Sequence, residues 1–123
     1  MALALRIRVD GVVQPEEYDE ESKDTMDPRG WYALAKEIVG GYVEQVNLPD
    51  SKLVMWVNED GLPMGLPVNR FATDWATVER MGFTTIVGDV LITGLSGEDT
   101  VAGLTAEEIR NILSENHLWM GEK

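Results

Sequence analysis

Hydrophobic and polar residues alternate along the first stretch of the chain, and this alternation predicts a β-strand. The apolar positions are Leu3, Leu5, Ile7 and Val9, and the intervening ones are Ala4, Arg6, Arg8 and Asp10. Asp10-Gly11 then favours a tight hairpin turn, after which Val12 and Val13 begin a second arm. We expect Pro15 to end this arm early, because its nitrogen has no hydrogen to donate to a partner strand.

A strongly acidic segment follows from residue 16 to residue 27. Seven of its twelve side chains are acidic and one is a lysine. Repulsion between like charges and the scarcity of apolar residues predict a loop or an extended arm here.

Apolar residues with helical spacing follow this segment. Asp27 is suited to the N-cap of a helix and Pro28 to its first position. One apolar stripe is formed at positions i, i+3, i+4 and i+7 by Trp31, Leu34, Ala35 and Ile38. Gly40-Gly41 would end this helix.

Two further strands, over residues 42–48 and 52–58, are predicted to form a hairpin. A three-residue loop, Pro49-Asp50-Ser51, would pair Glu44 with Trp56. A shift of one residue would exchange the two faces of each strand, so this register is a hypothesis for the structure to test.

A second helix is predicted after a loop rich in Gly and Pro over residues 59–68. Asn69 can cap this helix, and Gly82 would end it. Its apolar face would consist of Phe71, Trp75 and Val78.

The last strand and the last helix complete the pattern. Residues 83–94 are apolar and β-branched enough for a strand, with a bulge at Gly88-Asp89. Thr105 and Glu108 have the spacing of a capping box, which predicts the start of a helix there.

The order of these elements, β-β-α-β-β-α-β-α, predicts an α+β fold. We expect a mostly antiparallel sheet of four to five strands, with three helices packed on it in a single layer. Residues 1–123 would form one domain, with residues 16–27 as its acidic loop or arm.

Composition narrows the classes of function. Twenty-two acidic residues against ten Lys plus Arg give a net charge of −12, which disfavours direct binding to nucleic acids or anionic membranes. This charge would suit a basic protein partner, although acidity that serves only solubility is the simpler alternative. The absence of cysteine excludes disulfides and thiolate chemistry and favours the cytoplasm. No run approaches the ~20 apolar residues that span a bilayer.

Signatures of catalysis are missing from the sequence. His117 is the only histidine, and one imidazole cannot supply two ligands to a metal ion. No serine lies in a Gly-x-Ser-x-Gly motif, so a Ser-His-Asp triad is not indicated either. No phosphate-binding Gly-Lys-Ser/Thr motif occurs. We therefore expect no catalytic residue, no metal and no cofactor, and we favour a protein that is not an enzyme.

One group of polar residues is a candidate ligand site. Asn58, Glu59, Asn69 and Arg70 flank the loop at residues 61–67, and their amides, carboxylate and guanidinium could bind a small polar ligand. In the alternative interpretation the Asn residues cap turns, while Glu59 and Arg70 fix the loop. Asp89, within an apolar stretch, is a second polar residue that could be partly buried.

Aromatic and acidic residues suggest an interaction surface. Trp31 and Trp75 lie on predicted helix stripes, but Trp56 and Trp119 do not, and exposed tryptophans often anchor interfaces. A core position for Trp56 is equally compatible with its pattern. The acidic candidates for contact are Glu16, Glu17, Asp19, Glu20 and Glu21.

Four segments resemble a known family. They are Val39-Gly40-Gly41-Tyr42-Val43-Glu44, Trp56-Val57-Asn58-Glu59-Asp60-Gly61, Leu66-Pro67-Val68-Asn69-Arg70-Phe71-Ala72-Thr73 and Ile86-Val87-Gly88-Asp89-Val90-Leu91. Together they resemble an uncharacterised short domain family, a domain of unknown function found in actinobacteria, other Gram-positive bacteria and their bacteriophages. The resemblance spans residues 36–94 and leaves out the acidic segment and the last helix. It implies a phage or mobile-element setting and supplies no reaction, although its recurring residues favour a site at the Asn58–Arg70 loop.

Two functions from different classes follow. The first is a non-enzymatic protein-interaction module, a phage or mobile-element accessory factor that acts on a host protein. A mimic of DNA would be a special case of it, and a homodimer through a free sheet edge would make the partner a second copy. The alternative is a protein that sequesters or hydrolyses a small polar ligand at the Asn58–Arg70 loop.

Overall fold

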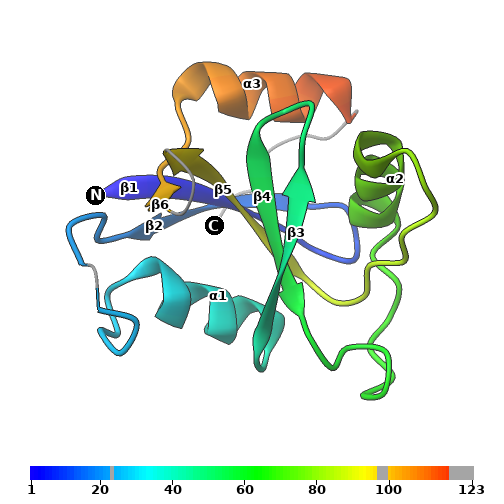
Figure 1. Cartoon of the computed structure of the whole chain (residues 1–123), viewed down its shortest axis with the longest axis horizontal. Coiled ribbons are helices and arrows are strands. Elements are labelled where there is room, and N and C mark those ends of the chain that lie inside the picture. The colour runs from blue at the N-terminus through cyan, green and yellow to red at the C-terminus, as the bar shows by residue number, and fades with distance from the viewer. Residues whose placement is uncertain (23, 97–99, 117–123) are drawn as a thin grey trace.

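The computed structural model of the chain describes residues 1–22, 24–96 and 100–116. Within these residues there are six strands and three helices (Figure 1). They are β1 (Ala2–Ile7), β2 (Val13–Tyr18), α1 (Trp31–Val39), β3 (Val43–Leu48), β4 (Leu53–Asn58), α2 (Arg70–Arg80), β5 (Val90–Ser96), β6 (Thr100–Ala102) and α3 (Ala106–Glu115). Every strand pair in this part of the chain is antiparallel, and the order is β2-β1-β5-β4-β3, with β6 also paired to β5. The predicted α+β class and antiparallel sheet are confirmed, and β6 is an additional strand that the pattern did not predict.

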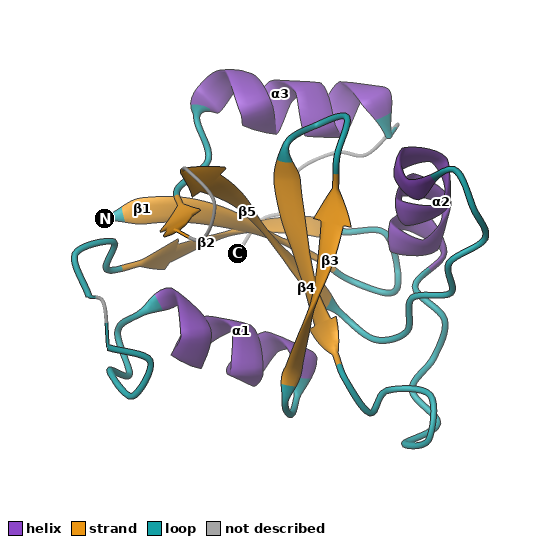
Figure 2. Cartoon of the chain, viewed as in Figure 1, coloured by secondary structure: helices purple, strands orange, loops and turns teal. Residues whose placement is uncertain are grey.

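The helices cover both faces of the sheet, whereas a single layer was expected (Figure 2). α1 packs on one face through Ala35 and Ile38, and α2 and α3 pack on the other through Trp75 and Ile112. The reason lies in β4, all six residues of which are buried. A strand that is apolar on both sides needs cover on both sides, so a second layer of helices is required.

The first hairpin forms as predicted, but its second arm is longer. The turn contains Gly11 at a positive φ of 86°, a conformation that glycine adopts without steric cost. β2 runs through Pro15 to Tyr18, so the expectation that Pro15 ends the strand is wrong. β2 is an edge strand of the sheet, where a proline can be accommodated because one side needs no hydrogen-bond donor. Glu16 and Glu17 therefore lie in a strand rather than in an arm.

The β3–β4 hairpin is shifted by one residue from the predicted register. Glu44 lies opposite Val57, and Trp56 lies opposite Gln45. The shift arises because Lys52 has a positive φ of 59° and belongs to the turn, which makes the loop four residues long.

α1 begins later than predicted. Its N-cap is Gly30, and Asp27 instead accepts hydrogen bonds from the Ser22 hydroxyl and from the backbone and side chain of Arg29. The Arg29 side chain is the main reason that the pKa of Asp27 is lowered to about 2. At the other end, Gly40 adopts the left-handed conformation of a C-cap, as predicted.

α2 and the segment after it differ most from expectation. The Asn69 cap is confirmed, but Val78 is 72% exposed and does not belong to the core. Residues 83–89 form a loop, and β5 begins only at Val90. An isolated antiparallel bridge joins Val87 of this loop to Val68. Hydrogen bonds of the Thr73 hydroxyl with Ile86 and of the Thr77 hydroxyl with Thr84 attach the rest of the loop to α2.

α3 agrees with the prediction. The side chain of Thr105 accepts a hydrogen bond from the Glu108 amide, and the Glu108 carboxylate accepts one from the Thr105 amide. This capping box satisfies two backbone donors at the start of the helix.

Candidate functional site

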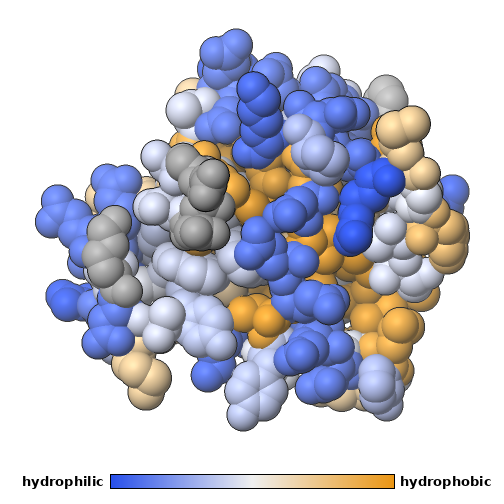
Figure 3. All heavy atoms as spheres, viewed as in Figure 1, coloured by the Kyte–Doolittle hydropathy of each residue, from blue (hydrophilic) through white to orange (hydrophobic). Residues whose placement is uncertain are grey.

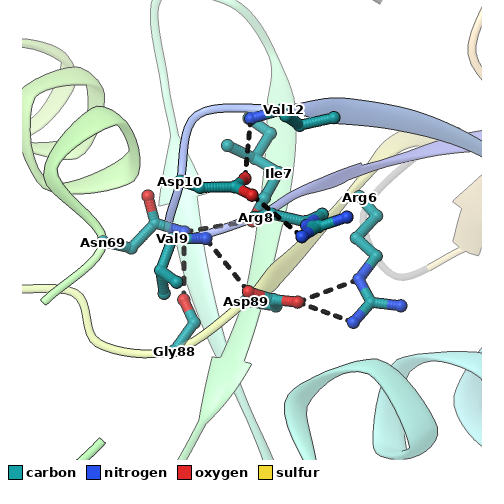
Figure 4. Close-up of polar contacts among 9 residues, drawn as sticks. All are labelled: Arg6, Ile7, Arg8, Val9, Asp10, Val12, Asn69, Gly88 and Asp89. Atoms are coloured by element: carbon teal, nitrogen blue, oxygen red, sulfur yellow. Dashed lines mark hydrogen bonds and ion pairs between the residues drawn. The ribbon is translucent and has the colours of Figure 1, made fainter. Parts of the chain in front are cut away.

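Asn69, one of the four predicted ligand-binding residues, is a structural residue. Its side chain is fully buried and donates to the carbonyls of Ile7 and Gly88, each at 3.0 Å (Figure 4). Its amide oxygen accepts from the backbone of Ala72 at 3.1 Å. Donors and acceptor are thus engaged within the chain, so Asn69 is not positioned to bind a ligand.

Asp89 has a similar role beside it (Figure 4). Its carboxylate accepts from the Val9 amide at 3.0 Å and pairs with the Arg6 guanidinium at 2.6 Å. The side chain is 18% exposed, which confirms partial burial. Because both oxygens bind the first hairpin, Asp89 fixes that hairpin to the start of β5.

The structure does not gather the four predicted residues into one pocket. Asn58 is buried and donates to the carbonyl of Val39, while its oxygen accepts from Asp60. Asn58 and Glu59 line a hollow of about 180 Å³ together with Arg80, whereas Asn69 and Arg70 do not line it. Arg70 is exposed and lies 4.0 Å from Asp74, an ion pair at the limit of contact. The Asn residues therefore fit the turn-capping alternative.

The two tryptophans predicted to lie at an interaction surface have different outcomes. Trp56 is buried, stacks on Trp31 with ring centres 4.5 Å apart, and donates to the Thr93 hydroxyl at 2.9 Å. It is a core residue. Trp119 and His117 lie outside the described residues.

The acidic candidates occupy different environments. Glu16 is buried in β2, and Asp19 is half-buried and accepts from the Glu21 amide. Glu17, Glu20 and Glu21 are exposed. Only part of the predicted acidic surface is therefore accessible to a partner.

A surface that sequence reasoning missed lies along α2 and the loops before and after it. It contains six of the ten large hydrophobic side chains that are exposed in the described part of the chain. We call it the α2 apolar surface, and it consists of Leu62, Met64, Val68, Val78, Met81 and Phe83. Figure 3 shows hydrophobic residues gathered on the side of the molecule formed by α2 and its neighbouring loops. Met81 is 92% exposed and Phe83 is 83% exposed.

A groove between α2 and α3 adjoins this surface, and we call it the α2–α3 groove. Its first hollow, of about 310 Å³, is lined by Phe71, Trp75 and Val78 and by the carboxylates of Asp74, Glu79 and Glu115. A second hollow of about 410 Å³ shares Glu79 and Glu115 and adds Asp50 and Glu108. No lysine or arginine lines either hollow among the described residues.

Both features could be found only partly from the sequence. The spacing of Phe71, Trp75 and Val78 predicts an apolar face on α2, but it does not show that Val78 stays exposed beside α3. The β-branched neighbours of Phe83 predict a strand, whereas Phe83 lies in a loop and is 83% exposed. Met81, beside a predicted helix end, gave no signal of exposure.

Two further findings bear on the kind of site. Across residues 1–22, 24–96 and 100–116, no group of three or more Asp, Glu, His or Cys side chains is arranged to hold a metal ion. In the same part of the chain, none of the helices has the length and hydrophobicity needed to cross a membrane.

A family model described as a domain of unknown function (DUF3846) matches residues 3–117, so the chain belongs to this family. The match includes the acidic segment and α3, which lay outside the resemblance seen in the sequence. Comparison with curated proteins and with solved structures finds no significant match.

Proposed function

Since the family has no assigned function, we propose one from the molecular surface: this chain is a non-enzymatic protein-interaction module that binds its partner through the α2 apolar surface. The observation that carries the proposal is the exposure of Met81 and Phe83 at the end of α2, on the side of the molecule where hydrophobic residues gather (Figure 3). A contiguous group of large exposed apolar side chains on a soluble domain marks an interaction site more often than chance exposure.

Charge supports a protein partner over other classes. The net charge of −12 opposes nucleic acids and anionic membranes. It would instead speed association with a protein that carries basic groups around an apolar centre. The partner is a host protein or a second copy of this chain.

The biological setting is also a proposal. The resemblance of the motifs between residues 39 and 91 to proteins of Gram-positive bacteria and their phages supports a phage or mobile-element accessory factor. Such a factor would act in the host cytoplasm, whose reducing conditions do not affect a chain without disulfides.

Affinity capture from a lysate of the organism that carries the protein tests this function. The double variant M81S/F83S should reduce the amount of captured partner at least tenfold, because both side chains are exposed and their loss removes contact area without disturbing the core. The variant M26S is the matched control, since Met26 is 83% exposed on the acidic segment.

Retention of the same partner by wild type and by M81S/F83S would exclude the α2 apolar surface as the contact. Loss of the partner only when Glu17, Glu20 and Glu21 are changed to glutamine would move the contact to the acidic segment. Capture of the protein alone by wild type would count against the whole function.

A second candidate, the binding or hydrolysis of a small polar ligand, is favoured by the hollow beside the Asn58–Arg70 loop. There Glu59 and Arg80 line the same 180 Å³ space as the hydroxyl-bearing residues Thr84 and Thr85. Native mass spectrometry of the protein purified from its own organism should then find a bound small molecule, and E59Q should release it. A spectrum with only the mass of the chain would argue against this candidate.

A further inference from the structure

We propose that the α2–α3 groove binds a basic amphipathic segment of the partner protein, with apolar side chains between the helices and Lys or Arg side chains on the surrounding carboxylates. This inference rests on the proposed interaction function and specifies which part of the partner is recognised.

The apolar part of the groove is the side of the α2 stripe that α3 leaves uncovered, where Val78 is exposed, Phe71 is half-buried and Trp75 is buried. Phe71, Trp75 and Val78 follow one another at i, i+4 and i+7 and line the first hollow. The stripe is most exposed at Val78, which also belongs to the α2 apolar surface. A bound segment would therefore make its apolar contacts mainly with Val78 and Phe71.

No described residue supplies a close counter-ion to the two carboxylates that both hollows share. Among the described residues, neither Glu79 nor Glu115 has a cationic nitrogen within 4.0 Å, and Asp74 has only Arg70 at that limit. Glu79 is only 8% exposed, and its oxygens accept from the backbone and hydroxyl of Ser51. A nearly buried carboxylate held by neutral donors alone gains more from an added cation than an exposed one, because little water screens the interaction.

The size of the groove and its negative charge select the kind of ligand. The two hollows adjoin at Glu79 and Glu115 and together receive five carboxylates and no cation from the described residues. Acidic segments would be repelled, and a wholly polar basic segment would leave the side of Val78 uncovered. A segment that combines cationic and apolar side chains satisfies both halves of the groove.

Titration of the full ¹⁵N-labelled chain with synthetic peptides tests the proposal. The probe is an amidated 14-residue peptide of Lys and Leu, with Leu at helical spacing. One control replaces every Lys by Glu, and another contains the same residues in scrambled order. We expect the basic amphipathic peptide to shift the amide signals of residues 71–79 and 115–116, the scrambled peptide to bind at least fivefold more weakly, and the acidic peptide not to bind.

Variants separate the groove from the general acidity of the protein. V78S should weaken binding about fivefold, and D74N/E115Q should weaken it at least tenfold in low salt and reduce its salt dependence. E17Q/E37Q removes the same charge from exposed positions away from the groove and should change binding less than twofold.

Several outcomes would overturn the inference. Equal losses in D74N/E115Q and E17Q/E37Q would mean that only overall charge attracts the peptide, and signal shifts spread over β2 or α1 would place the contact elsewhere. Shifts in the groove that depend on protein concentration without peptide would make a second copy of the chain the occupant.

The result is separable from that of the proposed function. If a partner is captured equally well by wild type, V78S and D74N/E115Q, the interaction function stands and the groove is not its site. If no partner is captured although the peptides behave as expected, the groove recognises basic segments but the proposed function fails.

Discussion

Asn69 joins three parts of the chain through one side chain. The hydrogen bonds of its side-chain amide connect the end of β1, the turn at Gly88 and the first turn of α2. Asp89 makes a parallel connection to Arg6 and Val9. Asn58 and Asn69, two of the four residues that resemble a ligand site in the sequence, thus satisfy backbone groups, which must be paired wherever water is excluded.

Among the described residues, Tyr18 has a buried polar side-chain group, its hydroxyl, that is left unpaired. It is 2% exposed, and its hydroxyl has no hydrogen-bond partner in the described structure. A buried hydroxyl without a partner costs about 1–3 kcal/mol. We therefore expect Y18F to be at least as stable as wild type at pH 8, and more stable by up to about 1 kcal/mol, in urea unfolding. Tyr42 is 65% exposed, so Y42F should change nothing.

The same residue predicts a loss of stability in alkali. Burial, followed by the nearby Glu20 carboxylate, raises the pKa of Tyr18 from 10.0 to about 12. Above pH 10 the unfolded chain releases a proton that the folded chain retains, so the free energy of unfolding decreases as the pH rises from about 10 to about 12. Y18F should lack this part of the decrease. An identical pH profile for wild type and Y18F would refute the assignment.

At the scale of elements, α2 acts as a partner for the extended segment before β5. Thr73 and Thr77 are four residues apart on the helix, a rise of about 6 Å. Thr84 and Ile86, which their hydroxyls bind, are two residues apart on an extended chain, about 6.6 Å. The two spacings nearly match, so one side of a helix can satisfy backbone groups that a strand would otherwise bind.

This arrangement predicts unequal effects for two similar substitutions. T73V removes the acceptor of the buried Ile86 amide at 2.8 Å and should lower the free energy of unfolding by about 2 kcal/mol. T77V acts on a contact that is only part-buried and should cost about half as much. Urea unfolding of both variants is the measurement. Equal, negligible effects would mean that the hydroxyls do not hold the loop.

Turns and helix caps could be predicted well from the sequence, whereas the order of the strands and the packing of the helices could not. The turn at Gly11, the caps at Asn69 and Gly40 and the box at Thr105 depend on neighbours within a few residues. The passage of β2 through Pro15 depends on which strand lies at the edge. The placing of helices on both faces of the sheet depends on how each helix packs against distant strands, and the α2–α3 groove depends on where α3 lies beside α2. Periodicity therefore places Val78 on a stripe without showing what faces it.

At the scale of the whole molecule, charge opposes the compact state. A net charge of −12 is brought into a small volume on folding, and the resulting repulsion is screened by salt. We expect the free energy of unfolding to rise by about 1 kcal/mol between 10 and 200 mM NaCl. Sucrose, which carries no charge, is the control that separates screening from a general effect of co-solutes. Constant stability across this range of NaCl would contradict the expectation.

The pairing of β1 with β5 also has a consequence for synthesis on the ribosome. Leu5 lies opposite Ile92, so the centre of the sheet cannot close until some 87 further residues have been translated. Contacts between such distant positions slow folding, because a long loop must close before they form. Until β5 has been translated, the first hairpin of the growing chain would leave the side chains of Leu5 and Ile7 exposed to solvent. We expect the nascent protein to depend on holding chaperones until β5 has left the exit tunnel.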